Sequence, residues 1–210
     1  AISIKNRKNL KSTFIPLLVK ITKNYNIDDN SSLNIFKWIV DQSKKHKLKN
    51  TFYFITGNTE NYAHPSFDTK YSIDHPVIRT LMKYLYSSGH NLGLHPSYNS
   101  YNNKERISSE LNKFCTVCDE ENFVLNYLSS RMHYLRWEQP RTLVALDKAG
   151  IDYDNTMSYV DHAGFRCGTC HEYPAFDTVN KIILKIRIRP LIAMEHTLIS
   201  KEYMGLGVSQ

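Results

Sequence analysis

The chain has 210 residues, of which 41% are hydrophobic and 22% are charged, so it can bury a sizeable core as one soluble globular domain. Much of its formal net charge of +7 lies in two lysine-rich runs, KNRKNLK near the N-terminus and KKHKLK at 44–49, and such runs are usually solvated faces rather than nucleic-acid surfaces. No run reaches the roughly 18 apolar residues of a membrane span, and no secretory signal is visible. We therefore expect a cytoplasmic protein with neither a membrane span nor a nucleic-acid partner.

The first predicted elements alternate between helix and strand. The spacing of apolar residues predicts a helix over about 32–46 and a buried strand over 50–56. A second helix is predicted over 75–89, because a proline stands in its first turn and a glycine ends it. The run NLGL at 91–94 predicts the next strand, which ends at His95.

The second half of the chain continues the alternation. Its predicted elements are a helix over 103–115, a mostly extended segment over 122–131, a helix over 140–150 that leads into the segment 151–160, and short strands at about 183–188 and 191–194. Strands that alternate with helices of this length indicate βα units, and hence an α/β fold with a parallel sheet or barrel. The segment GFRCGTCHEYPAFD at 164–177 has no clear periodicity and is interpreted as a loop able to wrap a polar ligand.

Polar side chains follow the ends of several predicted strands. His95, Arg131, Asp154 and Glu195 all lie at or just past such ends. Because α/β folds place their chemistry at the carboxyl ends of the strands, these positions predict a functional site.

The stretch GHNLGLHPSY at 89–98 contains two histidines, His90 and His95. A four-residue strand separates them, and at about 3.3 Å per residue it places their side chains roughly 13–17 Å apart. They cannot share one metal ion. We expect His90 to be a structural histidine and His95 to lie at the functional end.

A partner for His95 is found in the segment SRMHYLRW at 130–137, which supplies Arg131 and His133. Two neutral imidazoles from adjacent strand ends would suit Zn²⁺ or another borderline divalent ion. The alternative for His133 is a half-buried side chain with only a hydrogen-bonding role.

Two further segments carry candidate residues. Glu195 and His196 follow the apolar run at 191–194, where a carboxylate or an imidazole could act as general acid or base, or could be a solvated pair. Arg166 could contact an anion or a hydroxyl group from the loop 164–177, which could equally be a packed crossover.

The four cysteines form two CxxC pairs, Cys115/Cys118 and Cys167/Cys170, with the spacing of a zinc knuckle. The first pair ends a helical pattern, has no glycine, and is far from the second pair in sequence. We expect reduced thiols, and keep a basic zinc-ribbon protein that binds nucleic acid as one alternative.

The segments TFYFITGN, DHPVIRTLMKYLYSSGHNLGLHPSYNSY, SRMHYLRWEQPRTLVALDKAGIDYDNTMSYVDHAGFRCGTCHEYPAFD and RPLIAMEHTL resemble, in this order, a branch of the polysaccharide deacetylase superfamily. That branch is similar to enzymes encoded with bacterial surface-polysaccharide (O-antigen and capsule) assembly. The resemblance covers roughly 50–205 and implies a distorted (β/α) barrel. It implies one domain over 1–210, with 1–49 as a polar N-terminal region and helix and 50–205 as the barrel core.

The resemblance also implies a reaction. In the superfamily a divalent metal, commonly zinc, is held by an aspartate and two histidines, and a metal-bound water attacks the acyl carbonyl of an N-acetylated sugar. His95 matches the first metal histidine, whereas Asn99 stands where the second usually falls, so His133 is the replacement candidate. Glu195 falls where a late histidine motif would be, so the acid role goes to Glu195 or His196.

The expected partner is a carbohydrate, an N-acylated amino sugar or a polysaccharide intermediate. The residues expected to contact or orient it are Arg131, Ser97, Tyr98, Tyr134, Arg136 and Arg166.

One feature departs from the superfamily pattern. Its metal and base aspartates sit on a first strand, but residues 1–50 contain only Asp28, Asp29 and Asp41, none of which matches the motif. We therefore expect a barrel that lacks its first strand in this chain. The alternative function is a non-catalytic carbohydrate-binding or scaffolding relative on the same fold.

Overall fold

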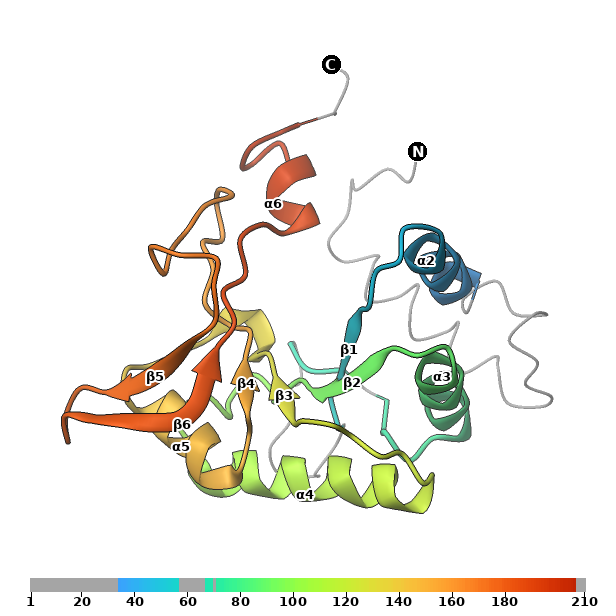
Figure 1. The fold of residues 1–210 in the computed structure, drawn as a ribbon, viewed down its shortest axis with the longest axis horizontal. Helices are drawn as coiled ribbons and strands as arrows, with labels where there is room; N and C mark the ends of the chain where they lie inside the picture. The colour runs from blue at the N-terminus through green and yellow to red at the C-terminus, as the bar shows by residue number, and fades with distance from the viewer. Residues whose placement is uncertain (1–33, 57–66, 70, 207–210) are drawn as a thin grey trace.

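A mixed β-sheet with helices packed against it forms the structure, a computed structural model that describes residues 34–56, 67–69 and 71–206 (Figure 1). The helices are α2 (Asn34–Lys45), α3 (Pro76–Ser87), α4 (Lys104–Glu120), α5 (Arg141–Ala149) and α6 (Glu195–Ile199), with a 3₁₀ turn, η2, at His133–Leu135. The strands are β1 (Thr51–Phe54), β2 (Asn91–Leu94), β3 (Ser129–Ser130), β4 (Tyr153–Asp154), β5 (Tyr173–Asp177) and β6 (Ile182–Ile188). The predicted α/β class is confirmed.

The strand order in the sheet is β1-β2-β3-β4-β6-β5. All neighbours pair in parallel except β5 and β6, which form an antiparallel pair with an irregularity between Pro174 and Phe176. In the described part of the chain β1 and β5 are the two edges, so the sheet is open there.

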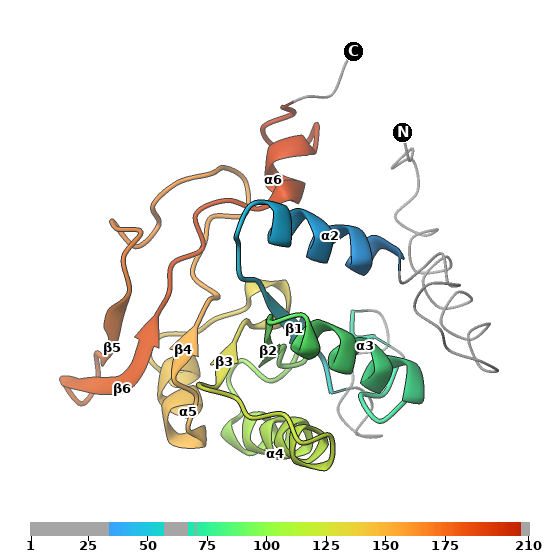
Figure 2. The same cartoon turned by 45° about the vertical axis from the view of Figure 1, so that its right-hand side comes forward.

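The two faces of the sheet differ in chemistry. Leu94 pairs with Ser130, and Asp154 pairs with Ile188, so these four side chains share one face, and all four are buried. Helices α4 and α5 lie on that side of the sheet (Figures 1 and 2). Helix α2 contacts the same face at the β1 edge, because its Phe36 packs against Phe52, whose side chain points to the same face as that of Leu92.

Helix boundaries follow from local signals. His75 caps α3 by accepting from the Val77 N–H, Pro76 occupies its first turn, and Gly89 follows it with φ +85°. Gly150 ends α5 in the left-handed conformation, φ +91°, which a side chain would strain. Both helices begin and end within two residues of the predicted bounds, 75–89 and 140–150.

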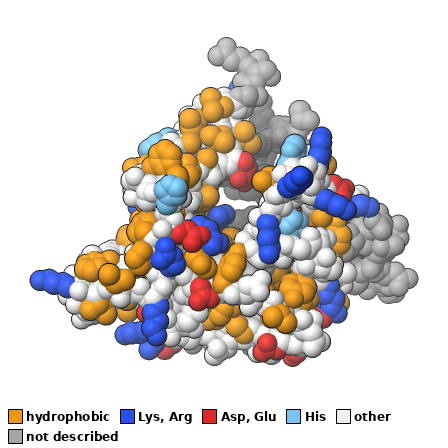
Figure 3. Space-filling view, in the orientation of Figure 1, with side chains coloured by type: hydrophobic (Ala, Val, Ile, Leu, Met, Phe, Trp, Pro, Cys, Tyr) orange, Lys and Arg blue, Asp and Glu red, His pale blue; other side chains and the backbone are white. Residues whose placement is uncertain are grey.

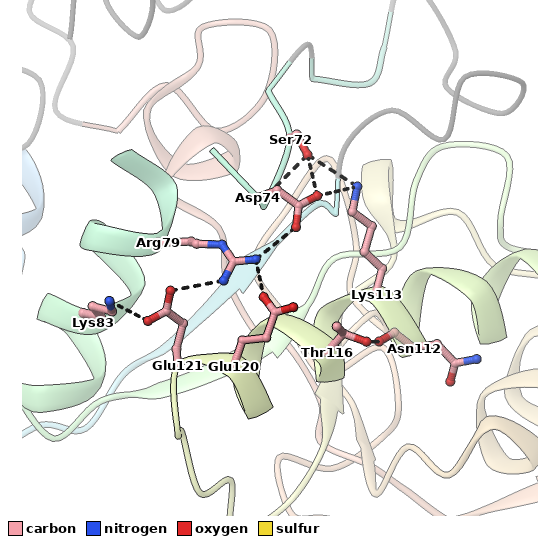
Figure 4. A network of polar contacts seen from close by, with 9 residues as sticks. All are labelled: Ser72, Asp74, Arg79, Lys83, Asn112, Lys113, Thr116, Glu120 and Glu121. Carbon is pink, nitrogen blue, oxygen red and sulfur yellow. Dashed lines mark hydrogen bonds and ion pairs between the residues drawn. The ribbon is translucent and has the colours of Figure 1, made fainter. Parts of the chain in front are cut away.

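Arg79 joins α3 to the end of α4 through a network of ion pairs (Figure 4). Its guanidinium contacts Glu120 at 2.6 Å, Glu121 at 3.2 Å and Asp74 at 3.2 Å, and Lys83 contacts Glu121 at 2.5 Å. Because Glu121 is only 11% exposed, this part of the network is better shielded from water than an ordinary surface pair.

Several predicted boundaries are wrong. The segment 191–194 is not a strand, and α6 begins directly after it. The last five residues of 164–177, a segment predicted to be a loop, form β5, because they pair with β6 in a hairpin that has no local sequence signal. Helix α4 continues through the first CxxC pair, and only Ser129 and Ser130 of the extended segment 122–131 form a strand.

The expectations for residues 1–33 lie outside the described residues. In the described part, no helix combines the length and the apolar character that crossing a bilayer requires.

Candidate functional site

A row of residues lies one position past the carboxyl edge of the parallel strands. The N–H of His95 donates to Phe54 O at 2.8 Å, that of Arg131 to Leu94 O at 3.1 Å, and those of Asn155 and Arg189 to Ser130 O and Asp154 O at 2.8 and 2.9 Å. The sheet ladder therefore continues by one residue, and it aligns His95, Arg131, Asn155 and Arg189 side by side. This row is the carboxyl-edge row.

His95 and His133 form a pair at one end of this row. Their rings are 4.9 Å apart and nearly perpendicular, and His133 Nδ1 lies 3.0 Å from His95 Nε2. His133 reaches this position because its own N–H donates to Pro96 O at 3.1 Å, directly after His95.

The outer nitrogens of both rings face carbonyl oxygens. His95 Nδ1 lies 2.5 Å from Arg131 O, and His133 Nε2 lies 2.9 Å from Phe67 O. A carbonyl can only accept, so both outer nitrogens carry the proton in the neutral rings. The two inner nitrogens, His95 Nε2 and His133 Nδ1, then present lone pairs to each other.

Burial, and next the nearby His133, lowers the pKa of His95 to about 3, so this ring is neutral at neutral pH. Two lone pairs at 3.0 Å repel each other unless a cation, either a proton or a metal ion, lies between them. Two Zn–N bonds of about 2.0–2.1 Å at a tetrahedral angle hold their nitrogens roughly 3.3 Å apart. The donor set of the pair therefore fits a divalent metal such as zinc.

Asp68 is the carboxylate next to the pair. Its Oδ1 lies 4.0 Å from His133 Nε2 and accepts from the Tyr98 N–H at 2.8 Å, and its side chain is only 2% exposed. It faces the outer nitrogen of His133, so its observed role is to support that ring and the loop after β2.

A second buried carboxylate, that of Glu110, holds the loop that follows β2. Glu110 of α4 accepts from the Ser97 N–H at 2.8 Å and from the hydroxyls of Ser97 and Ser100 at 2.5 and 2.7 Å. Burial raises the pKa of Glu110, while these donors oppose the rise. Ser97, expected to touch the sugar, is buried and holds the loop instead.

Aromatic side chains form a wall beside the histidines. Phe67 stacks on Tyr98 with ring centroids 4.4 Å apart, and Tyr134, which is 57% exposed, meets both rings edge-on. Arg136 lies 4.0 Å from the Tyr98 ring and donates to Tyr98 O and to Asn99 Oδ1 at 2.7 and 3.1 Å. Tyr98, Tyr134 and Arg136 are thus brought together near the histidines.

The wall depends on an unusual backbone. Tyr134 and Leu135 have φ values of +57° and +52°, a left-handed conformation that side chains other than those of Gly and Asn rarely adopt. Such conformations cluster at functional sites, because the surrounding structure must impose them. The left-handed turn places the Tyr134 ring against the His133 ring, with centroids 4.7 Å apart.

Arg131 and Asn155 continue the carboxyl-edge row. Arg131 Nε donates to Asn155 O at 3.3 Å, and its guanidinium lies 5.0 Å from the Tyr53 ring. Tyr53 donates to Asn155 Oδ1 at 2.8 Å, and burial raises the pKa of this tyrosine, so the phenol stays protonated.

Asp154 is not part of the site, although its strand-end position suggested it. Its side chain points to the helix-covered face and is fully buried, where it accepts from Ser130 Oγ at 3.1 Å and from the Thr156 hydroxyl and N–H at 2.8 and 3.0 Å. Asp154 is the last residue of β4, as its position suggested, but successive side chains of a strand point to opposite faces, so the next residue, Asn155, is the one that lies in the carboxyl-edge row.

The remaining candidates lie elsewhere. Glu195 and His196 are exposed on α6, and neither contacts His95 or His133. Arg166 is exposed and donates to Ser158 O at 2.7 Å.

His90 and the cysteines have other roles. His90 lies before β2, at the opposite end from His95, as the rise of the strand predicts, and its Nδ1 accepts from the Asn50 N–H at 3.3 Å. All four cysteines are free thiols, with the first pair on α4 and the second in the loop before β5.

Sequence reasoning missed Asn155, Arg189, Asp68 and Glu110. Asn155 and Arg189 were detectable in principle, because each directly follows a run that forms a parallel strand. Asp68 and Glu110 carry no local signal, since only the folding of the chain brings them to the loop after β2.

Within the described ranges, no group of three or more His, Cys, Asp or Glu side chains is arranged to hold a metal ion. Comparisons with models of protein families, with curated proteins and with solved structures give no match to this chain.

Proposed function

We propose that this chain is a metal-dependent hydrolase that removes an N-acyl group, such as acetyl, from an amino sugar of a bacterial surface polysaccharide or its precursor. In this proposal it is a relative of the polysaccharide deacetylases, and its sheet is part of their distorted barrel. His95 and His133 hold the metal, most simply zinc.

One observation carries the proposal: the inner nitrogens His95 Nε2 and His133 Nδ1 face each other at 3.0 Å, while both outer nitrogens face carbonyl oxygens. Fixing the outer proton of a ligand histidine by a carbonyl is the usual way in which proteins orient metal-binding imidazoles. The position at the carboxyl end of β2 is also where α/β folds place their sites.

A bound divalent ion would lower the pKa of a water molecule and polarise the acyl carbonyl. The chain itself supplies orientation. Arg131 O and Phe67 O hold the two rings, and Asp68 and Glu110 hold the loop between them.

The aromatic wall supports a sugar as the substrate. Tyr134, which is 57% exposed, presents its ring and hydroxyl beside the histidines, whereas Tyr98 is covered by Phe67 and Arg136. An exposed aromatic ring can pack against the C–H face of a pyranose ring. Glu195 and His196 keep the proposed acid role only if α6 approaches the pair when substrate binds.

The test is elemental analysis of the purified chain after mild dialysis, alongside His95→Ala and His133→Ala. We expect about one equivalent of zinc in the parent chain and loss of it in both variants, because each removes one of two adjacent ligands. His171→Ala is the matched control, since His171 is exposed in the loop before β5. Release of acetate from N-acetylated sugars is then assayed in the same four proteins.

A parent chain without metal, or variants that keep it, would contradict the hydrolase. A second candidate, a non-catalytic carbohydrate-binding relative, is favoured by the exposed Tyr134 together with the lack of a third described ligand. It predicts sugar binding that needs no metal and is lost in Tyr134→Ala.

A further inference from the structure

A groove of about 680 Å³ lies on the face of the sheet opposite α4 and α5. Figure 3 shows a hollow in the middle of the molecule with Lys and Arg side chains on its walls. The groove is lined by Ile39, Ser43, Lys49, Asn50, Thr51, Phe52, Tyr53, Asn91, Tyr127, Arg131, Asn155 and Arg189.

The charged side chains that line the groove are all positive. It includes the cations Lys49, Arg131 and Arg189, and no carboxylate is among these described lining residues. The other polar groups are amides, hydroxyls and phenols, which bind the hydroxyl groups of a ligand without adding charge. A groove of this composition attracts a ligand that is both negatively charged and rich in hydroxyls.

The two arginines are placed to share one anionic group. They belong to the carboxyl-edge row on either side of Asn155, two strand spacings apart, which puts their Cα atoms roughly 10 Å from each other. Both side chains are long enough to converge above Asn155, and guanidinium groups bind carboxylates and phosphates through two parallel hydrogen bonds.

The donors of Arg131 are only partly used. Its Nε donates to Asn155 O at 3.3 Å, and within the described ranges its terminal nitrogens make no hydrogen bond. The side chain is half-buried against the Tyr53 ring, so its orientation is already set. Little conformational entropy would be lost when it binds an oxyanion.

Arg189 is held by stacking and by a carboxylate outside the groove lining. Its guanidinium lies 4.2 Å from the Tyr153 ring and 5.3 Å from the Tyr127 ring. Its Nε donates to Glu172 Oε1, so Glu172 competes with a ligand for part of its charge.

The groove and the histidine pair share a residue. Arg131 faces the groove with its guanidinium, while its carbonyl oxygen faces His95 Nδ1 at 2.5 Å. The histidines do not line the groove themselves, but an anion bound to Arg131 contacts the residue whose carbonyl oxygen orients His95.

We propose that this groove binds the oxyanion of a charged saccharide, either a carboxylate or a phosphate, between Arg131 and Arg189. This inference rests on the proposed function, because it names the substrate class of that same site: an acidic amino sugar, or one carried on a phosphate.

The test is calorimetric titration of the full chain with methyl glucuronide, glucose 1-phosphate and uncharged methyl glucoside, after treatment with EDTA. We expect at least one charged sugar to bind at least tenfold more tightly than methyl glucoside, with an affinity that falls as NaCl is added. Preference for glucuronide or for glucose 1-phosphate identifies the carboxylate or the phosphate as the source of the oxyanion.

Four variants sharpen the test. Arg131→Gln and Arg189→Gln should each weaken the binding of the preferred charged sugar tenfold or more. Arg187→Gln is the matched control, because Arg187 lies near the same Glu172 carboxylate, at 3.9 Å, but does not line the groove. Glu172→Gln should tighten binding several-fold by releasing Arg189, a gain that loss of structure cannot mimic.

The inference is overturned if charged and uncharged sugars bind equally, if none binds, or if Arg131→Gln and Arg189→Gln bind as the parent does. Its failure is distinct from failure of the proposed function, because binding is measured without metal. A chain that takes up no zinc but binds the charged sugar would overturn only the hydrolase. A zinc-loaded, active chain that is indifferent to sugar charge would overturn only the groove inference.

Discussion

The two faces of the sheet, compared at the same strands, have opposite chemistry. On the helix-covered face, Leu94 and Ile188 are at most 4% exposed, and the buried carboxyl group of Asp154 between them accepts hydrogen bonds from Ser130 and Thr156. On the other face, Tyr53 and Arg189 line a polar groove. One face is packed under helices, and the other presents polar side chains to a groove.

The difference comes from the alternation of side chains in a strand. In β6, Leu184 and Ile186 are buried while Ile183 and Lys185 are exposed. From Leu184 onward the even residues belong to the core, and the odd residues are free to be polar. A change on the first face should therefore alter stability, and one on the second face should alter binding.

The largest expected effect is that of Leu94→Ala on the helix-covered face. Leu94 is fully buried, so the cavity and the lost contacts should lower the free energy of unfolding by about 2–5 kcal/mol. Urea denaturation measures this loss. Ile183→Ala is the control from the opposite face, where the side chain is 70% exposed and the change should stay within about 0.5 kcal/mol. Equal losses would mean that the two faces do not differ in packing.

Asp154→Ala should cause the next largest loss in the free energy of unfolding, because it leaves the buried donors of Ser130 and Thr156 without their acceptor. The expected loss is about 1–3 kcal/mol.

The pH dependence of Asp154 has a definite sign. Burial raises its pKa in the folded state, so the folded protein binds more protons than the unfolded one above about pH 4, and stability falls as the pH rises through the folded pKa. Asp154→Asn should remove this slope. An unchanged slope in urea titrations between pH 4 and 8 would show that Asp154 ionises as freely as in water.

Gly93→Ala should disturb the groove face, with a smaller effect on stability. A Cβ at Gly93 would lie 2.7 Å from Tyr53 Cε1 and 2.8 Å from Ser129 Oγ, so the tyrosine ring must move. We expect a loss of about 1–2 kcal/mol, together with weaker binding of the charged sugar. Gly164→Ala, whose nearest neighbours would be 3.6 Å away, should change neither. Binding that survives with full stability would show that the position of Tyr53 is not needed.

The smallest effect is expected in the ion-pair network between α3 and α4. The ammonium of Lys83, and then the guanidinium of Arg79, hold the pKa of Glu121 below its usual range. Glu121→Gln should therefore lower the free energy of unfolding by about 1 kcal/mol at pH 7.

This contribution has the opposite pH dependence to that of Asp154. It is present above the unfolded pKa of about 4.3 and is lost as the pH falls through the lower folded pKa. Glu105→Gln, an exposed change in the first turn of α4, is the control. A Glu121→Gln loss that persists at pH 3 would mean that packing, not charge, is responsible.

The sequence by itself determined the local elements of this protein. Apolar spacing and the Pro and Gly boundaries predicted α3, β2 and α5 to within two residues, because these signals act between near neighbours. The rise of a β-strand, about 3.3 Å per residue, also predicted that His90 and His95 lie at opposite ends of β2. The position of His95 after β2 follows from the sequence alone.

Only the tertiary structure decided which side chains meet. The tautomers of His95 and His133 depend on Arg131 O and Phe67 O, and no local sequence pattern predicts these two contacts. The direction of Asp154, and the line of cations formed by Arg131 and Arg189, depend on strand register. Register is a long-range property, set when the apolar faces of separate strands are buried together, and a shift of one residue would exchange the core with the groove.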